Sequence, residues 1–329
     1  MDLHLNRMNP LKGIHHVTAI TGDAQPNVDF YSGVLGLRLV KKTVNFDDPG
    51  SYHLYYGDRF GTPGTLVTFF VWPGAARGRT GAGEPVALAF EVPEASLEWC
   101  KQRVTGAGIR VSQAVNVFGD NVLSIADPDG MRVELVARNT ARETEYWAGG
   151  GVSKHNAITA IHSVALALRD QVTSGRLYTG ELTFQEEQAK GDVRRFRVGE
   201  GASAAFVDAV TPSVASRGRM GAGTIHHMAF RTDDDASQRE WLERLSQIGL
   251  NLSPVMDRKY FHSIYFRELG DVLFEIATDG PGMAVDENRG QLGQALQLPS
   301  EYESLRTSLE RTLPPITAPR LSSVEAVRA

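Results

Sequence analysis

A short apolar pattern that occurs four times constrains this chain more than any other feature. Its copies lie at residues 13–17, 85–90, 160–164 and 224–230, and they are rich in β-branched residues. A short apolar run of this kind is typical of a buried strand. Such self-similarity indicates a repeated structural unit whose copies bury a core together.

Each copy is followed by the same kinds of segment. Apolar residues at helical spacing come next, at 28–37, 96–105, 175–182 and 238–250. A glycine or a short turn lies near the end of each predicted helix. Strand-like segments then follow, such as 121–125 with 132–137 and 260–266 with 272–278, and turn residues divide the two members of each pair. The unit is therefore a strand, a helix and about three further strands.

The sequence thus predicts an α+β fold with four βαβββ repeats. These would form two cup-shaped mixed sheets with the helices outside. Residues 1–141 would hold two repeats, the first of which supplies a metal-binding histidine, and residues 142–156 would be a linker. Residues 157–300 would hold the other two repeats, the fourth supplying a histidine and a glutamate. Residues 301–329 would form a C-terminal helix and tail.

Composition excludes several classes of protein. Hydrophobic residues make up 42% and charged residues 22% of the 329, which is ordinary globular usage. The net charge of −5 argues against a nucleic-acid-binding protein, whose binding face is usually basic. The single cysteine, Cys100, excludes an internal disulfide and a cysteine-rich metal site. No apolar run approaches a membrane span, and no secretory signal is evident, so we expect a cytoplasmic protein without a membrane partner.

Two His-His pairs lie at equivalent positions of the repeats. Alignment of the four copies places His16, Ala87, Ser163 and His227 in register. Alternate residues of a strand face opposite sides, so His16 shares a face with Thr18. The same rule turns His15 and His226 to the other face unless a β-bulge redirects them.

A carboxylate recurs in the last strand of two repeats. Glu275 in the fourth repeat and Glu134 in the second lie within apolar strands, at nearly the same distance from the aligned position. In the first repeat Thr68 falls near that place, and the third shows only alanine and phenylalanine around 205–206. A carboxylate buried among apolar residues needs a partner, a metal or a proton.

The pairing of the repeats decides whether these residues can make a metal site. If neighbouring repeats pair, each cup holds one histidine and one glutamate. If the first repeat pairs with the fourth, one cup collects His16, His227 and Glu275, and the other keeps only Glu134. We favour the second arrangement because it completes a set of two histidines and one carboxylate. This set suits non-haem Fe(II) that activates O₂, although manganese, zinc or nickel can occupy similar ligands.

The chain resembles the vicinal oxygen chelate superfamily, which includes glyoxalase I, extradiol dioxygenases and bleomycin-resistance proteins. This likeness rests on the four repeats and on two further segments, residues 30–37 and 127–135. The chain is most similar to the branch of hydroquinone ring-cleaving dioxygenases. That likeness rests on 13–18, 225–230, 257–261, 263–268 and 274–282, and it runs over nearly the whole chain.

The resemblance implies a non-haem iron extradiol-type dioxygenase that degrades aromatic compounds. Its metal ligands map onto the same three residues, His16, His227 and Glu275. The substrate would be a hydroquinone-type para-diol, with methyl or chloro substituents allowed, and the second substrate would be O₂. The residues implied to contact the substrate are His15, Thr18, His226, Arg258 and Tyr265.

The resemblance also suggests roles for these residues. One ionised substrate oxygen would bind the iron, and His226 or His15 would take or share its proton because histidine has a near-neutral pKa. Arg258 would stabilise negative charge on oxygen, and Tyr265 would hydrogen-bond the same oxygen.

Two other functions stay open, because a fold does not fix a function. The first is a glyoxalase-like metal-dependent isomerase or transferase, whose sites usually carry four protein ligands; Thr68 at the fourth position favours an open site instead. The second is a non-catalytic protein that binds aromatic compounds. Among the remaining histidines, His162 is predicted to be structural. His53, His155 and His262 are predicted to be surface or packing residues, although His262 lies near Arg258 in sequence and could line a pocket. A homo-oligomer is compatible with the sequence.

Overall fold

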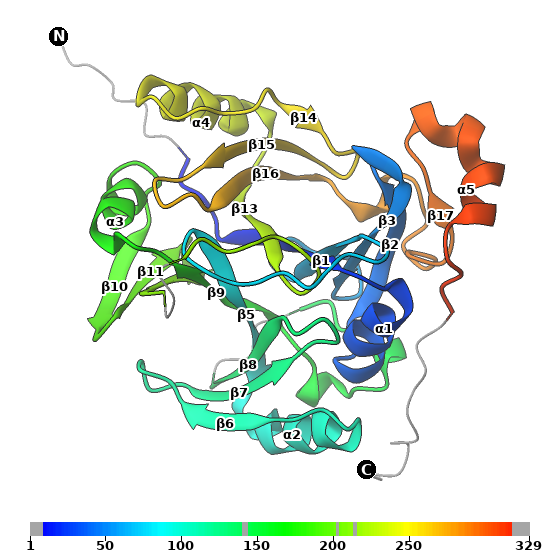
Figure 1. Ribbon diagram of the computed structural model, residues 1–329, viewed down its shortest axis with the longest axis horizontal. Helices are drawn as coiled ribbons and strands as arrows, with labels where there is room; N and C mark the ends of the chain where they lie inside the picture. The colour runs from blue at the N-terminus through cyan, green and yellow to red at the C-terminus, as the bar shows by residue number, and fades with distance from the viewer. Residues whose placement is uncertain (1–8, 140–143, 202–203, 213–215, 318–329) are drawn as a thin grey trace.

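Two curled mixed sheets form the centre of the molecule, and the helices lie at its periphery (Figure 1). The computed structural model describes residues 9–139, 144–201, 204–212 and 216–317. The first residues of the predicted linker and the end of the predicted tail lie outside this set. The α+β class and the two curled sheets expected from the repeats are confirmed.

The first and fourth repeats build one nine-stranded sheet, with the order β14-β15-β16-β13-β1-β4-β3-β2-β17. Its strands are β1 (Ile14–Thr21), β2 (Arg38–Asn45), β3 (Asp48–Gly57), β4 (Leu66–Val71), β13 (Ile225–Thr232), β14 (Met256–Asp257), β15 (Phe261–Arg267), β16 (Leu273–Pro281) and β17 (Leu296–Gln297). The antiparallel pair β1 and β13 joins the two repeats. This is the pairing that completes the predicted ligand set.

The second and third repeats build an eight-stranded sheet, with the order β10-β11-β12-β9-β5-β8-β7-β6. Its strands are β5 (Glu84–Pro93), β6 (Ser112–Val115), β7 (Asn121–Ala126), β8 (Arg132–Arg138), β9 (Ala160–Ala167), β10 (Gln185–Lys190), β11 (Val193–Val198) and β12 (Ala205–Val210). The antiparallel pair β5 and β9 joins its two halves.

Each repeat contains a helix between its first and second strands. These are α1 (Ala24–Val28), α2 (Leu97–Gly106), α3 (Gln171–Gly180) and α4 (Asp235–Gln247). The first is shorter than the sequence predicted, because a π-helical turn, Asp29–Val34, follows it directly. The predicted C-terminal helix is a 3-10 turn, Ser300–Leu305, followed by α5 (Arg306–Thr312). No helix among the described residues is long and apolar enough to cross a bilayer.

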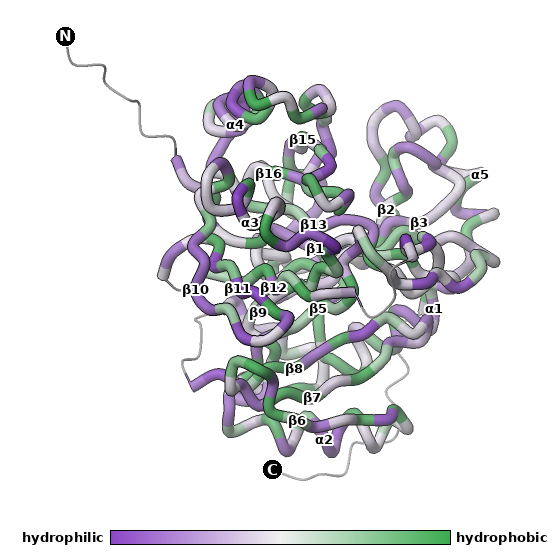
Figure 2. The backbone as a smooth tube through the Cα atoms, turned by 60° about the vertical axis from the view of Figure 1, so that its left-hand side comes forward, coloured by the Kyte–Doolittle hydropathy of each residue, from purple (hydrophilic) through white to green (hydrophobic). Residues whose placement is uncertain are grey.

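The main core joins strand residues such as Val17 and Phe90 to helix residues such as Val104 and Trp241, so the helices complete it. Figure 2 shows hydrophobic residues along the central strands and hydrophilic residues gathered on α4 and β10. The side chains of β10 are all exposed, as suits a charged edge strand that discourages pairing with another chain.

The pair β1 and β13 contains two β-bulges, and they fall on two of the histidines. The register runs from Ile14↔Phe230 to His16↔Ala229, so His15 is an extra residue on β1. It also runs from Thr18↔His227 to Ala19↔Ile225, so His226 is an extra residue on β13. A bulge redirects the side chain of its extra residue. Simple strand alternation therefore does not apply to His15 or His226.

Candidate metal centre and active-site cavity

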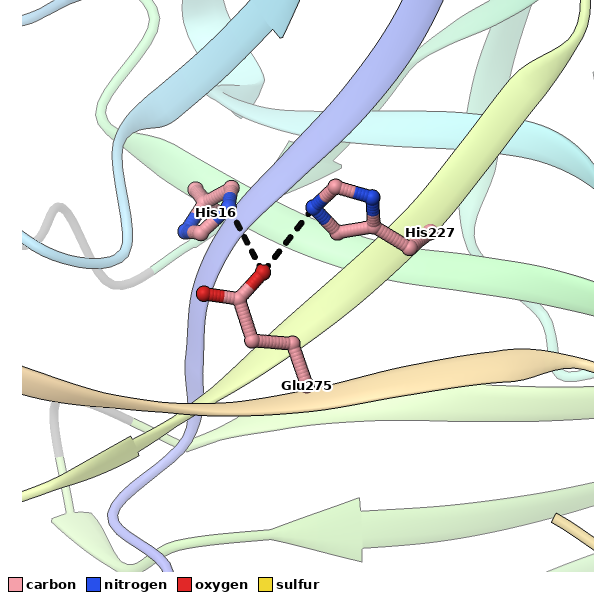
Figure 3. A group of neighbouring side chains, drawn as sticks. All are labelled: His16, His227 and Glu275. Atoms are coloured by element: carbon pink, nitrogen blue, oxygen red, sulfur yellow. Dashed lines mark ion pairs between the residues drawn. The ribbon is translucent and has the colours of Figure 1, made fainter. Parts of the chain in front are cut away.

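Three side chains from adjacent parts of the nine-stranded sheet converge on one buried point. His16 comes from β1, His227 from β13 and Glu275 from β16. Oε2 of Glu275 lies 2.9 Å from Nε2 of His227 and 3.4 Å from Nε2 of His16 (Figure 3). The ligand atoms of all three lie within 4.8 Å of one another. The structure thus brings together the three residues that the sequence assigned to a metal.

Their hydrogen bonds fit a cation. Nδ1 of His16 lies 2.9 Å from Nδ1 of His15, and Nδ1 of His227 lies 2.7 Å from Nδ1 of His226. A neutral imidazole has one donor and one acceptor nitrogen. If the two inner histidines donate from Nδ1, their Nε2 lone pairs point at Glu275, whose Oε2 is buried without a well-formed hydrogen bond from a described residue. Converging lone pairs repel one another unless a cation lies among them.

The carboxylate is held in place by a second contact. The Ser263 hydroxyl, on β15, donates to Oε1 of Glu275 at 2.5 Å. Burial by itself would raise the pKa of Glu275, but hydrogen bonds and positive charge from His16 and His227, when those rings present a proton to it, hold the pKa well below its usual value. The residue is therefore a carboxylate with one oxygen fixed by Ser263 and the other directed at the two histidines.

The metal centre borders a cavity of about 340 Å³. Four of the residues predicted to contact a substrate line it: Thr18, His226, Arg258 and Tyr265. The fifth, His15, is not among the lining residues. It is buried behind His16, and its ring lies 4.9 Å from that of Phe261. The bulge on β1 therefore directs His15 to a metal ligand instead of to the cavity.

Burial changes the protonation expected for the two outer histidines. Burial and the neighbouring His227 lower the pKa of His226 to about 3. Burial and the neighbouring His16 hold the pKa of His15 well below its ordinary value. Both imidazoles are consequently neutral near pH 7. The near-neutral pKa that made them attractive as bases in the sequence is absent here.

Arg258 and Tyr265 meet on one wall of the cavity. Nε of Arg258 donates to the Tyr265 hydroxyl at 3.3 Å, and Nη1 of Arg258 lies 3.2 Å from the exposed Asp47 carboxylate. Burial raises the pKa of Tyr265 well above its ordinary value, so its hydroxyl keeps its proton. The wall therefore presents a guanidinium and a phenol, both hydrogen-bond donors.

Sequence reasoning missed the opposite wall. His53 and Tyr55 on β3, with Phe70 on β4, also line the cavity, although His53 was predicted to be a surface or packing residue. The signal that could have found them is alternation: His53 and Tyr55 lie two apart on β3, and Phe70 lies two residues after Thr68 on β4, the strand that pairs with β1. Thr68 lies between them and β1; its hydroxyl is 2.8 Å from both Thr18 Oγ1 and His53 Nε2.

The eight-stranded sheet encloses a second cavity, of about 640 Å³, without a comparable ligand set among its described lining residues. By strand register, Ser163, Ala87 and Glu134 occupy the places of His16, His227 and Glu275. A buried ion pair lies in this cup: Arg195 binds Asp208 at 2.7 and 2.8 Å.

Comparison with known proteins identifies the relatives of this chain. Residues 13–135 match the Glyoxalase/Bleomycin resistance protein/Dioxygenase superfamily. The chain is 41% identical to MhqO of Bacillus subtilis (strain 168), provisionally named a ring-cleaving dioxygenase, over 92% of this chain and 96% of MhqO. It is 32% identical to a chlorohydroquinone/hydroquinone 1,2-dioxygenase of Sphingobium indicum, over 92% of this chain and 96% of that protein.

Solved structures show the same fold. A crystal structure of a provisionally named dioxygenase from Bacillus subtilis has a TM-score of 0.90 and 40% identity, and covers 94% of this chain and 99% of its own. Glyoxalase I from Zea mays shares the fold at a TM-score of 0.61 and 15% identity, over 81% of this chain and 92% of its own. Relatives that match almost the whole chain, together with its two curled sheets, show its family. The chain belongs to the glyoxalase/bleomycin resistance/dioxygenase superfamily, among its ring-cleaving dioxygenases.

Proposed function

We propose that this protein is an Fe(II)-dependent dioxygenase that cleaves the ring of hydroquinone-type para-diols with O₂. The observation that carries the proposal is the buried group of His16, His227 and Glu275 at the edge of a cavity lined by aromatic side chains and hydrogen-bond donors. The relative that acts on chlorohydroquinone and hydroquinone supports the substrate class.

Iron would supply open coordination positions for substrate and O₂, because three protein ligands leave part of its coordination shell free. The protein would bind and orient the diol. The rings of Phe70 and Phe261 give the cavity apolar surfaces for an aromatic ring. The two para hydroxyls point in opposite directions, so only one of them can approach His16, His227 and Glu275.

Arg258 and Tyr265 would stabilise negative charge on a substrate oxygen. The Arg258 guanidinium favours the ionised form of a phenol, since an opposite charge nearby lowers its pKa. The Tyr265 hydroxyl accepts from Arg258 and has its own proton to donate. These groups are fixed before the substrate arrives, which is the condition for effective electrostatic stabilisation.

His226 would act as a donor. With its Nδ1 accepting a hydrogen bond from Nδ1–H of His227, the neutral ring carries its single proton on Nε2. It can then donate a hydrogen bond to an oxygen of the substrate or product. This role replaces the role of a base that the sequence suggested. A hydrogen-bond donor has to be neutral here and not basic, so the pKa of about 3 for His226 is compatible with it.

Thr68 favours an open metal site over a glyoxalase-like one with four protein ligands. Its hydroxyl is engaged by Thr18 and His53, and it offers no carboxylate. We therefore rank the isomerase or transferase below the dioxygenase.

The test is anaerobic loading with Fe(II), followed by O₂ consumption with hydroquinone, methylhydroquinone, chlorohydroquinone and catechol. We expect stoichiometric uptake and a ring-opened product with para-diols, and little uptake with catechol. Uptake with catechol alone would retain the dioxygenase but reject the para-diol. No uptake with any of the four, in protein that retains its iron, would reject the proposal.

A further inference from the structure

A chain of four side chains runs along the cavity wall opposite Arg258. The Tyr55 hydroxyl lies 3.0 Å from Nδ1 of His53, and Nε2 of His53 lies 2.8 Å from Oγ1 of Thr68. Oγ1 of Thr68 lies 2.8 Å from Oγ1 of Thr18. Tyr55, His53 and Thr18 line the cavity, and Thr18 follows the metal ligand His16 by two residues on the same strand.

The number of protons on these four side chains decides which group donates in each hydrogen bond. Among the described residues, the hydroxyl of the buried Tyr55 has His53 Nδ1 as its hydrogen-bond partner. Burial raises the pKa of Tyr55 and lowers that of His53, so the phenol is protonated and the imidazole neutral. The phenol therefore donates to Nδ1, and the ring carries its single proton on Nε2.

The remaining links follow from this first one. Nε2–H of His53 donates to the Thr68 hydroxyl, and that hydroxyl can then donate its own proton to Thr18. The oxygen of Thr18 is thereby occupied as an acceptor, and its proton is left for the cavity.

We propose that Tyr55, His53 and Thr68 are positioning residues that make Thr18 an oriented hydrogen-bond donor to an anionic substrate oxygen beside the metal ligands. This inference rests on the proposed function, because it takes a phenolate as the ligand. Bonds that point the same way along a chain polarise one another, and a low dielectric strengthens them. A donor fixed in advance favours the charged oxygen over a neutral one.

The second cup provides an internal comparison. By strand pairing, Ala165, Asp208, Val193 and Arg195 occupy the places of Thr18, Thr68, His53 and Tyr55. None of the four residues is kept. The chain of hydroxyls and imidazole is thus confined to the cup that contains the two histidines and Glu275, which argues that it serves the site and not the fold.

The experiment compares Thr68→Val with Thr68→Ser. Valine has nearly the shape of threonine but lacks the hydroxyl, so it interrupts the series of hydrogen bonds. Serine keeps the hydroxyl. Both variants and the wild type are loaded anaerobically with Fe(II), their iron content is checked, and 4-nitrophenol and its uncharged methyl ether, 4-nitroanisole, are titrated into each. Absorbance reports how much of the bound 4-nitrophenol is ionised.

We expect Thr68→Val to bind 4-nitrophenolate about tenfold more weakly, the range typical of a hydrogen bond to a charged group. Its affinity for 4-nitroanisole should be unchanged, and Thr68→Ser should match the wild type for both ligands. A second variant, Tyr55→Phe, leaves Thr68 intact and should weaken only 4-nitrophenolate.

Equal binding of 4-nitrophenolate by Thr68→Val and Thr68→Ser would overturn the inference, as would an equal loss for both ligands. Failure of the proposed function has a different signature. In that case the wild type would show no O₂ uptake with para-diols, whatever the phenolate affinities of the variants.

Discussion

The two oxygens of Glu275 have different neighbours, and the difference matters for every residue around it. Oε1 accepts a hydrogen bond from Ser263, whereas Oε2 faces the nitrogens of His16 and His227. A buried carboxylate arranged in this way is costly without a cation. The same residue type at the equivalent place in the other cup, Glu134, is paired with Arg132 instead.

Glu275→Gln should remove metal binding, because an amide is a poor substitute for the charged ligand. In the wild type, added Fe(II) or Zn(II) should raise the melting temperature, since a ligand at 100 times its Kd stabilises by about 2.7 kcal/mol. The variant should show no such rise in a thermal-shift assay. Glu134→Gln is the matched control and should respond like the wild type. A metal-dependent rise retained in Glu275→Gln would contradict the assignment of the ligand.

Ser263→Ala tests the residue that holds the carboxylate. Loss of a hydrogen bond to a metal-binding carboxylate typically weakens metal affinity by about 10–100-fold. We expect that loss in a competition titration with a chelating dye, with the far-UV circular dichroism spectrum unchanged. Ser263→Thr keeps the hydroxyl and should restore most of the affinity. If the Ser263→Ala and Ser263→Thr variants bound metal equally well, the hydrogen bond from Ser263 would have no part in holding Glu275.

The sequence was sufficient to predict three residues that the structure brings together, but not to predict their surroundings. Repeat register and the preference of metals for two imidazoles and a carboxylate identified His16, His227 and Glu275. The roles of Asp47 and His53 depend on how the hairpin of β2 and β3 folds over the cavity. A contact of that kind joins distant segments and leaves no periodic signal in the sequence.

Irregularities in single elements set the direction of several side chains. The bulges at His15 and His226 place both side chains against metal ligands, where plain alternation would turn them away. In the first repeat, the π-helical turn Asp29–Val34 adds a residue to the helical period. Each irregularity inserts a residue and is stabilised by partner segments, so hydrophobic periodicity cannot reveal it.

The turn between β7 and β8 contains a carboxyl group with an unusual environment. Oδ1 of Asp127 accepts from the backbone N–H groups of Asp129 and Met131, and Oδ2 accepts from the Tyr31 hydroxyl. Burial is the larger effect and raises the pKa of Asp127 to about 6. The folded protein therefore keeps this proton to a higher pH than the unfolded chain does.

Asp127→Asn should consequently change how stability depends on pH. Between about pH 4 and pH 6 the folded state binds more protons at this group than the unfolded state, so its contribution to stability falls as the pH rises. The variant lacks that contribution, and its urea midpoint should fall less over this window than that of the wild type. Asp271→Asn, at an exposed turn, is the control and should follow the wild type. Parallel curves for wild type and Asp127→Asn would contradict the raised pKa.

At the scale of the whole molecule, the two sheets share their strand pairing and their β-bulges but carry different side chains on the faces that line the cavities. Bulges recur in the second sheet, at Val86 and His162. Arg195 binds Asp208 and Asp120 there, and its guanidinium lies 4.0 Å from the Phe118 ring centroid. A fixed cation thus occupies the cup in which the described residues form no set of metal ligands.

Arg195→Met should destabilise the protein by about 3–5 kcal/mol, because it leaves buried carboxylates without their partner. The measurement is the free energy of unfolding in urea. Arg195→Met combined with Asp208→Leu should recover much of the loss, since removing both partners of a buried pair is far less costly. Iron binding should persist in both variants. A loss below about 1 kcal/mol in the single variant would show that the pair is dispensable.

The pairing of the first repeat with the fourth also has a consequence for biosynthesis. β1 leaves the ribosome early, but its partner β13 and the strand that carries Glu275 follow near the end of the chain. At ~5–20 residues per second, the interval is on the order of ten seconds or more. The second and third repeats can meanwhile join through β5 and β9. The nascent protein can therefore reach a stage in which β5 and β9 are paired while β1 still lacks its partner β13, so that His16 has not yet met His227 and Glu275.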